Sequence, residues 1–341
     1  MPTAESPAVP PHARLVEMAT AAWISMIVHG AAKIALADHL GSGAKTAEQL
    51  AGPTGTHAPS LHRLMRTLAA LGVLTEGPAR HFALTPLGEA LKQGAPGGAR
   101  ATILTFAGNH FWDVMKEFPY SLATGKSAHE HITGMPLFEW FGRHPDEASL
   151  FGESMVGFHG GEPPAVAAAY DFSGVGTLVD VGGGTGNLIT AICARHGKVR
   201  GVLFDLPHVD TDARALIASR GLSDRISVTT GSFFDRVPEG GDAYIMSHVI
   251  HDWDDDQCVT ILRNCRKVMP RGGRLLIVES VLPPGDTPHP GKILDMVMLL
   301  APGGQERTEE EYRVLLAKAD LRLTRVVPTH SAVSLVEAVP A

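Results

Sequence analysis

The sequence predicts an α/β domain built on a doubly wound, mostly parallel sheet, preceded by a mainly helical domain. Three observations carry this prediction. An apolar strand at 177–181 runs directly into a glycine-rich loop and an apolar helix, the opening of a nucleotide-cofactor site in such a sheet. Strand and helix patterns then alternate towards the C-terminus. The first 95 residues instead show helices followed by one hairpin pattern.

Length and composition set the outer limits. A chain of 341 residues with 44% apolar and 19% charged residues is long enough for two globular domains. The net charge of −7 argues against a general nucleic-acid surface. Three cysteines without metal-ligand spacing predict reduced thiols in a cytoplasmic protein and no metal site.

The N-terminal segment is expected to begin with a loose tail over 1–11, which contains four prolines. One long helix follows over 12–39, or two helices joined near Gly30. The stretch 18–37 is rich in Ala and Ile, but His29 and Lys33 interrupt it. We judge it too polar to span a bilayer and expect a buried amphipathic helix, with no membrane partner.

A winged-helix pattern follows. Thr46 and Gln49 predict a capping box on a short helix, a second helix is expected over 59–71, and 73–85 alternates like a small hairpin. Such a domain often binds DNA, but residues 1–95 hold seven Lys and Arg against six Asp and Glu, a net charge of +1. A dimerisation module is therefore favoured over a nucleic-acid partner. The apolar helix around Trp23 and Ile24 likewise predicts a homodimer.

Residues 96–164 are expected to be helical with breaks, and they are unusually rich in large aromatic side chains. Such side chains most often form core. Polar residues such as Asn109 and His159 are interspersed with them, so the alternative is an apolar pocket with a few polar anchors.

The α/β domain is expected from about residue 165. Strands are predicted at 177–181, 199–204, 225–229, 242–247, 274–280, 321–327 and 331–337. Asp254 with Gln257, and Thr308 with Glu311, predict capping boxes on two of the helices. The last two strands should pair as a hairpin, which makes the seven-stranded sheet mixed.

The spacing of the glycine loop decides which cofactor it fits. A dinucleotide fingerprint is G-x-G-x-x-G, and its third glycine would fall on Asn187. The loop instead has G-x-G-x-G at Gly182, Gly184 and Gly186, and Asp205 ends the next strand, where an acid would bind ribose hydroxyls. This set fits S-adenosylmethionine better than NAD.

Acid and base residues gather at the same edge of the predicted sheet. His251 follows the fourth strand, Glu279 ends the next, and Glu306 lies in the loop before the helix capped by Thr308. A phenol with a pKa of ~10 needs a base poised near neutrality, which histidine supplies, and a carboxylate on one imidazole nitrogen fixes its tautomer. His251 is the candidate base, although most of the 17 histidines must be structural or exposed.

Four motifs now make a family resemblance specific. LVDVGGGTG (178–186), FDLP (204–207), HDW (251–253) and GGQERT (303–308) occur in that order. Together they resemble the metal-independent small-molecule O-methyltransferases, typified by plant caffeic acid and isoflavone enzymes, hydroxyindole O-methyltransferase and bacterial antibiotic-tailoring relatives in secondary metabolism. The resemblance covers essentially the whole chain. It implies a Rossmann-like methyltransferase domain after a winged-helix dimerisation domain.

The resemblance also implies roles for particular residues. His251 would be the general base of methyl transfer to a phenolic hydroxyl, flanked by Glu279 and Glu306. S-adenosylmethionine, with S-adenosylhomocysteine as product, would be held by Gly182, Gly184, Gly186, Asp205, Leu206, Ser232, Phe233 and Ser247. An aromatic small-molecule acceptor is expected to contact Asn109, Trp112, Met155, His159, Asp252, Asp295 and Met298. The expected domains are 1–95, a linker and pocket region at 96–164, and 165–341.

Two departures from the family pattern and several alternatives remain. Ser232 stands where the family commonly has an acid for the adenine amino group, and Ser247 where plant members often have lysine. One alternative is a relative that binds the cofactor but acts as a hydroxylase or decarboxylase. Another is a ligand-sensing winged-helix regulator. An NAD oxidoreductase and a metal-dependent caffeoyl-CoA-type enzyme fit the sequence less well.

Overall fold

The computed structural model describes residues 10–341, which form two compact units. The helical unit comprises the residues up to Asp113 together with Phe141–Gly160. The sheet unit comprises Val114–Trp140 and Gly161–Ala341. Each unit has its own core, and each is described by itself. The predicted tail lies mostly outside the described residues.

The sheet unit is organised around a seven-stranded mixed sheet with the strand order β10-β11-β7-β6-β3-β4-β5. Strand β11 is antiparallel to both of its neighbours, and the other pairs are parallel. The strands are β3 (Thr177–Val181), β4 (Arg200–Asp205), β5 (Ile226–Thr230), β6 (Ala243–Ser247), β7 (Arg274–Glu279), β10 (Leu321–Pro328) and β11 (Ser334–Pro340). The predicted strands and the mixed sheet are confirmed, with boundaries shifted by no more than three residues.

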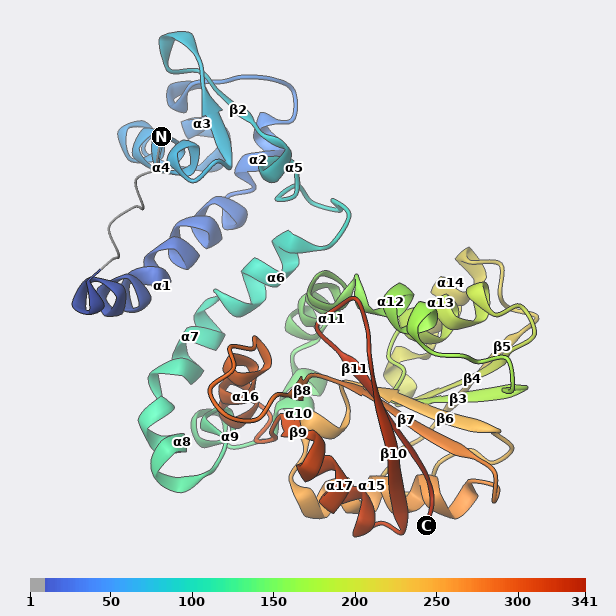
Figure 1. The fold of residues 1–341 in the computed structure, drawn as a ribbon. Coiled ribbons are helices and arrows are strands. Elements are labelled where there is room, and N and C mark those ends of the chain that lie inside the picture. The colour runs from blue at the N-terminus through green and yellow to red at the C-terminus, as the bar shows by residue number, and fades with distance from the viewer. Residues whose placement is uncertain (1–9) are drawn as a thin grey trace, which may run out of the picture. The chain divides into compact units, whose positions relative to one another are not determined.

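Helices cover both faces of this sheet (Figure 1). One face packs against α12 (Glu162–Ala169), α13 (Asn187–Arg195) and α14 (Asp210–Ser219), and the other against α15 (Asp255–Val268) and α17 (Glu309–Ala317). Alternate residues of β3 serve the two cores, because side chains alternate along a strand. Leu178 belongs to the core under α12–α14, whereas Val179 and Val181 belong to the core under α15 and α17.

The register of the parallel strands brings their carboxyl ends to one edge. Val181 pairs with Phe204 of β4, and Ser247 of β6 pairs with Val278 of β7. The glycine loop, Asp205 and Glu279 therefore all follow or end strands at the same edge. Ligands bind at this edge in doubly wound sheets.

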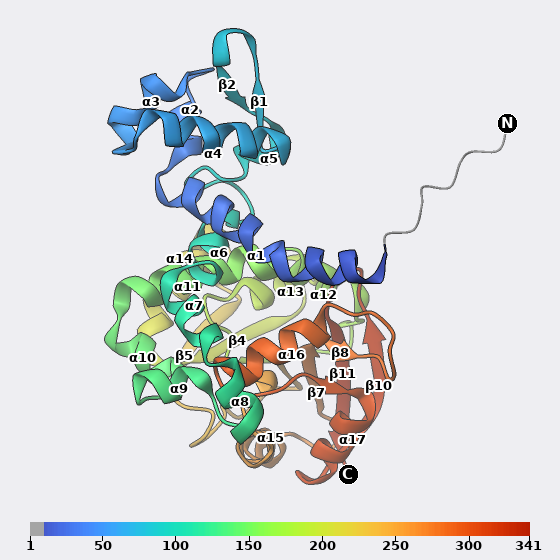
Figure 2. The same cartoon turned by 90° about the vertical axis from the view of Figure 1, so that its left-hand side faces the viewer.

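Several short elements complete the sheet unit. They are α8 (Phe118–Thr124), α9 (Ala128–Thr133), α16 (Gly291–Leu300), the two-residue strands β8 (Val281–Leu282) and β9 (Arg307–Thr308), and the 3-10 turns η2 (Pro207–Val209) and η3 (Ile250–Asp252). Helix α16 packs beside α8 and α9 (Figures 1 and 2). The hydroxyl of Ser127 donates to the carbonyl of Ala301 over 2.6 Å, which ties α9 to the end of α16. The β8–β9 ladder was not expected, because two-residue strands leave no periodic signal.

The helical unit contains the expected winged-helix arrangement. Its elements are α1 (Pro11–Lys33), α2 (Leu36–Leu40), α3 (Ala47–Thr54), α4 (Ala58–Ala70), β1 (Leu74–Glu76), the 3-10 turn η1 (Pro78–Arg80), β2 (Phe82–Leu84), α5 (Pro86–Glu89), α6 (Ala99–Phe106) and α11 (Pro145–His159). Helices α7 (Asn109–Lys116) and α10 (Leu137–Arg143) cross the boundary between the units. The first long helix breaks at Ala35, which has a φ of 50°, and not at Gly30.

The helix caps follow the sequence closely, with one difference. Thr46 with Gln49, and Thr308 with Glu311, form complete capping boxes. The side chain of Asp254 accepts a hydrogen bond from the Gln257 amide, but the return bond from the Gln257 side chain is not present. At the start of this helix, the Asp254 side chain therefore accepts a hydrogen bond from a backbone amide in the first turn, as a single N-cap residue does.

Helix α1 corrects an expectation. It is long and apolar enough by length and composition to cross a membrane, so calling it too polar was wrong. Length and composition alone are weak evidence for a membrane span, because core helices of soluble proteins and signal sequences share them. Nor is the helix buried within its own chain. Only Ala31 and Ala32 are buried, while Trp23 is 65% exposed and Ile24 50%. A contiguous exposed apolar face of this kind is typical of a surface that binds another protein or a membrane.

Candidate active site

The turn after β6 carries the candidate base. His248 adopts a left-handed backbone with a φ of 53°, and the 3-10 turn η3 then places His251 in the interior. One oxygen of Glu279, Oε1, accepts backbone hydrogen bonds from the amides of Val249, Ile250 and His251 at 3.1, 3.0 and 3.4 Å. The end of β7 therefore holds the turn that follows β6.

The His251 ring lies among three carboxylates. Its Nδ1 is 2.7 Å from Oε1 of Glu306 and 3.4 Å from Oε2 of Glu279, and its Nε2 is 3.6 Å from Oδ1 of Asp252. His251, Glu279 and Glu306 are all buried. A carboxylate can only accept, so the Glu306 contact places the proton of a neutral ring on Nδ1. The lone pair then lies on Nε2.

The loop that supplies Glu306 packs directly on the turn that carries His251. A Cβ at Gly304 would overlap the carbonyl oxygen of His251 and lie 2.5 Å from the carbonyl carbon of Asp252. That carbonyl of His251 also accepts from the Gln305 amide over 2.9 Å. Asp295 of α16 accepts from the Glu306 amide over 2.8 Å. Such close backbone packing is possible only for glycine.

Arg307 is a positioning residue that sequence reasoning missed. Its side chain is almost completely buried and donates to the carbonyls of Ile250 and Trp253 at 3.0 and 3.3 Å. It also pairs with Asp255 of α15 at 3.0 Å. A buried guanidinium with these partners ties the Glu306 loop to the His251 turn and supplies a positive charge near the carboxylates. Its place in the GGQERT motif was the available signal.

Burial changes the acidity of the surrounding carboxyls. The pKa of Glu279 is raised well above its ordinary value, first by burial and then by the charges of Glu306 and Asp252. The pKa of Asp252 is raised to about 6, mainly by burial, although His251 opposes the shift. Burial also raises the pKa of Asp295. Like charges crowded in a low dielectric disfavour full ionisation.

The glycine loop and the end of β4 form the candidate cofactor site. The Gly184 amide donates to Oδ2 of Asp205 over 2.7 Å, and the Leu206 amide donates to Oδ1 over 2.6 Å. Each of these oxygens keeps a second acceptor position for a ligand hydroxyl. A Cβ at Gly184 would meet nothing within 4 Å, so the loop is open there. The residues present therefore fit a nucleoside ligand at this edge.

Two of the loop glycines are required by packing. Gly182 has a φ of +72°, and a Cβ there would lie 2.8 Å from Val249. Gly186 has a φ of +87°, and its Cβ would lie 2.8 Å from Leu203. Both positions are left-handed and crowded, which excludes side chains. The glycine loop is thus fitted between the β4 core and the turn that carries His251.

A second turn borders the glycine loop. The Ser232 hydroxyl accepts from the Phe234 amide over 3.2 Å, and the Phe233 ring would lie 3.5 Å from a Cβ at Gly182. The Asn264 side chain of α15 donates to the carbonyls of Phe233 and Phe234 over 2.9 Å each. Ser247 ends β6 half-buried at the same edge of the sheet. The predicted cofactor residues thus come together in the sheet unit.

The predicted substrate residues divide between the units. Asp252, Asp295 and Met298 lie in the sheet unit, the first two near His251 and Glu306. Four belong to the helical unit, and their predicted role stays a prediction: Asn109, Trp112, Met155 and His159. Within that unit the Trp112 indole donates to the carbonyl of Ala107 over 3.0 Å.

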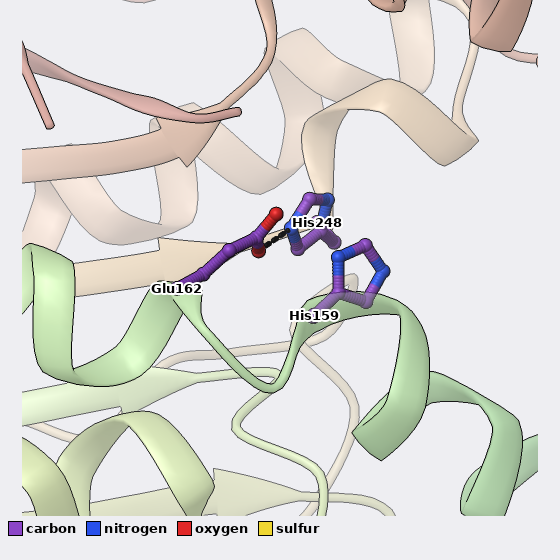
Figure 3. Close-up of side chains that lie close together, drawn as sticks. All are labelled: His159, Glu162 and His248. Carbon is purple, nitrogen blue, oxygen red and sulfur yellow. Dashed lines mark hydrogen bonds and ion pairs between the residues drawn. The ribbon is translucent and has the colours of Figure 1, made fainter. Parts of the chain in front are cut away.

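A second histidine–carboxylate pair was not predicted. Nε2 of His248 lies 2.7 Å from Oε2 of Glu162, the first residue of α12 (Figure 3). On its other side, Nδ1 of His248 is 3.7 Å from Oε2 of Glu279. The strand-end position of His248 was visible in the sequence, but nothing there pointed to Glu162, 86 residues earlier.

Comparisons with known proteins identify the family of this chain. The O-methyltransferase domain model matches residues 116–322, and the O-methyltransferase dimerisation domain model matches residues 16–94. A phenazine O-methyltransferase of Lysobacter antibioticus is 41% identical over 98% of this chain and 97% of that protein. An aclacinomycin 10-hydroxylase of Streptomyces purpurascens is 35% identical over 87% of this chain and 81% of that protein.

One similar protein has been solved with its ligands bound. It is an O-methyltransferase from neocarzinostatin biosynthesis in complex with S-adenosylmethionine and 2-hydroxy-5-methyl naphthoic acid. It shares 34% identity and a TM-score of 0.81, and the match covers 93% of this chain and 96% of that chain.

The chain therefore belongs to the O-methyltransferase family, with a Rossmann-like catalytic domain and the family's dimerisation domain. It is an S-adenosylmethionine-dependent O-methyltransferase, as the sequence motifs predicted.

The packing of Gly304 yields a first test. Gly304→Ala should displace the His251 turn and lower kcat by about 100-fold, since misplacement by about 1 Å can cost that much. Gly272→Ala is the matched control, because a Cβ there meets nothing within 4 Å. Methyl-transfer kinetics of both variants measure the difference. Equal activities would show that the loop moves aside without cost.

Proposed function

We propose that this protein transfers the methyl group of S-adenosylmethionine to a phenolic hydroxyl of an aromatic small molecule, with His251 as the general base. One observation carries the proposal: a buried imidazole whose Nδ1 lies 2.7 Å from Glu306, at the cofactor edge of the sheet. This tautomer leaves Nε2 to take the proton of the acceptor.

His251 can act as a base because neighbouring carboxylates stabilise the positive charge that its ring gains with the proton. When Nε2 takes the phenol proton, the ring becomes an imidazolium between Glu306 and Glu279. A carboxylate beside the charged ring stabilises it, as nearby opposite charge does in general. Glu279 also fixes the backbone of the turn. The two glutamates are thus positioning residues, and His251 is the group that meets the acceptor.

The cofactor supplies an already electrophilic methyl group when bound. The residues proposed to hold it are Gly182, Gly184, Gly186, Asp205, Leu206, Ser232, Phe233 and Ser247. Asp205 would accept the ribose hydroxyls through the lone pairs that the loop amides leave available. Adenine recognition at position 232 would differ from the common family pattern, because a hydroxyl replaces the usual acid.

The acceptor is proposed to be aromatic and phenolic. Two relatives act on or bind aromatic compounds according to their names, a phenazine and a naphthoic acid. The proposed acceptor contacts in the sheet unit are Asp252, Asp295 and Met298. For the helical unit we keep the contacts predicted from the sequence: Asn109, Trp112, Met155 and His159. We place the protein in antibiotic or other secondary metabolism and in the cytoplasm.

One relative is named a hydroxylase, which is the alternative reaction expected from the sequence. Against a hydroxylase reaction in this chain, a buried base with two supporting glutamates has a direct use in deprotonating a phenol. A regulator that binds DNA would need a basic recognition surface, and the near-neutral first 95 residues do not provide it.

We further propose a homodimer and the domain limits 1–95, 96–164 and 165–341. The exposed apolar face of α1 lies within the segment matched by the dimerisation model. A second copy would cover that face, as in large obligate interfaces.

Sedimentation tests the dimer. At micromolar concentration the protein should sediment at about twice its chain mass of 36.1 kDa. Trp23→Glu should shift it towards monomer by placing a charge in the interface, whereas Arg63→Glu, on an exposed position of α4, should not. A clean monomer for the unaltered protein would rule the dimer out.

The ribose contact can be tested by calorimetry. Asp205→Ala should weaken S-adenosylhomocysteine binding by roughly 1.5–3 kcal/mol, the usual worth of a hydrogen bond to a charged group. Asp242→Ala is the matched control, since Asp242 accepts from the Gly176 and Thr177 amides at the start of β3. Unchanged affinity in the Asp205 variant would refute its assignment to the cofactor.

The base is tested by turnover. His251→Ala should lower kcat ~10²–10⁴-fold while S-adenosylhomocysteine affinity stays nearly unchanged. His251→Gln should fail equally, because glutamine cannot take the proton, and Glu306→Gln should cost less. Transfer of labelled methyl to a panel of phenols measures this, with exposed His330→Ala as control. Wild-type turnover of a neutral phenol by His251→Ala would reduce His251 to a structural role.

A further inference from the structure

Asp180 of β3 is a buried carboxyl that the mechanism above does not use. Its side chain is 1% exposed, and among the described residues neither of its carboxyl oxygens has a hydrogen-bond partner. The strand is central, because Asp180 pairs with Leu203 of β4 on one side and with Ile245 of β6 on the other. A carboxyl is costly to bury without partners, so its place in the middle of the sheet calls for a reason beyond packing.

The Asp180 carboxyl lies directly under the glycine loop. A Cβ at Gly183 would be 2.8 Å from both Cγ and Oδ2 of Asp180. Because side chains alternate along β3, Asp180 shares a face with Leu178, on the side of the sheet that packs against α12, α13 and α14. The backbone amide of Ile189, in the first turn of α13, lowers the pKa of Asp180 although it makes no hydrogen bond of normal geometry to it. The carboxyl therefore lies between the loop and the start of α13, on the inner side of the candidate cofactor site.

Two carboxyls are close to each other at this edge, and their surroundings separate their acidities. Asp205 accepts hydrogen bonds from the amides of Gly184 and Leu206, and these amides oppose the rise in its pKa that burial causes. Asp180 has no such donors. Burial first, and then the charge of Asp205, raise the pKa of Asp180 to about 7. Of two neighbouring acids, the one without donors to its ionised form holds the proton.

The other groups that face Asp180 leave this proton in place. The Cys193 thiol of α13 interacts with Asp180, but burial raises its pKa to about 11, so it is uncharged near neutral pH. No positively charged side chain of the described residues contributes to the pKa of Asp180. The chain itself thus supplies no charge that would compensate an ionised Asp180.

We propose that Asp180 is a counter-ion for the positive charge of the cofactor: its carboxyl is protonated in the free protein near neutral pH and loses that proton to solvent when S-adenosylmethionine binds at the glycine loop. This inference rests on the proposed placement of the cofactor at that loop. S-adenosylmethionine carries a sulfonium and an ammonium against one carboxylate, whereas S-adenosylhomocysteine has a neutral thioether in place of the sulfonium. Positive charge brought to a buried carboxyl favours its ionised form.

Proton release fixes the direction of the pH dependence. Because S-adenosylmethionine favours the ionised form of Asp180, its affinity should rise as the pH rises through the pKa of the free carboxyl. If binding lowers that pKa by about one unit, about half a proton is released per cofactor near pH 6.5, and the affinity differs about tenfold between the protonated and the ionised protein.

Calorimetry in buffers of different ionisation enthalpy counts this proton. Near pH 6.5 the unaltered protein should release about half a proton more with S-adenosylmethionine than with S-adenosylhomocysteine. Asp180→Asn keeps the size of the side chain but cannot ionise, so the difference should vanish. The variant should bind S-adenosylmethionine about tenfold more weakly than the unaltered protein near pH 8, and only about twofold more weakly near pH 6. The amino group of the cofactor titrates in both proteins, so the ratio of their affinities isolates Asp180.

Asp242→Asn is the matched control. Asp242 accepts from the Gly176 and Thr177 amides at the opposite end of β3, so this variant should release the same number of protons as the unaltered protein. If Asp180→Asn does not fold, infrared difference spectra of the unaltered protein carry the test. S-adenosylmethionine, but not S-adenosylhomocysteine, should then remove a protonated-carboxyl band that moves when aspartate is labelled with heavy carbon.

Two results overturn the inference. One is equal proton release with both ligands in the unaltered protein. The other is a folded Asp180→Asn variant that keeps the difference, since another group would then release the proton. Neither result affects the assignment of the cofactor to the glycine loop, which is refuted instead by unchanged S-adenosylhomocysteine affinity in Asp205→Ala.

Discussion

The two oxygens of the Glu279 carboxylate hold the catalytic edge together in different ways. Oε1 accepts the amides of the 3-10 turn, and Oε2 lies against two imidazole rings. The end of β7 therefore sets both the backbone path and the electrostatic surroundings of His251. A buried carboxylate is costly unless donors surround it, and here most of those donors belong to the turn itself. Loss of the turn would leave Glu279 unsatisfied, and loss of Glu279 would leave the turn unsupported.

The loop that carries Glu306 is also held to the His251 turn by close packing and hydrogen bonds. Gly304 allows the loop to lie against the His251 carbonyl, and Arg307 donates hydrogen bonds to the carbonyls of Ile250 and Trp253. The guanidinium adds a fixed positive charge where several carboxyls are buried together. Raised pKa values at Glu279 and Asp252 show that this compensation is incomplete. Groups with perturbed pKa values cluster at functional sites, so these shifts agree with the proposed role of this edge.

Sequence reasoning found the fold, and it named the histidine and the two glutamates that the structure brings together, because these features leave local signals. The β3 strand and its glycine loop, the cap at Thr308 and the strand-end position of Glu279 are all local patterns. It missed Glu162 because no short-range pattern joins it to His248. It also misjudged α1, since hydrophobic periodicity indicates a helix but not which molecule will cover it.

The sequence by itself determined the order of strands and helices, the glycine spacing that suits S-adenosylmethionine, and the identity of a histidine and two glutamates at one sheet edge. Only the tertiary structure decided which atoms of these residues meet. The tautomer of His251 follows from a contact between residues 55 positions apart. The closeness of Glu162, His248 and Glu279 follows from the contact of the start of α12 with the turn after β6, and of that turn with the end of β7. Hydrogen bonds act over about 3 Å, so their partners are set by how distant segments pack and not by local sequence.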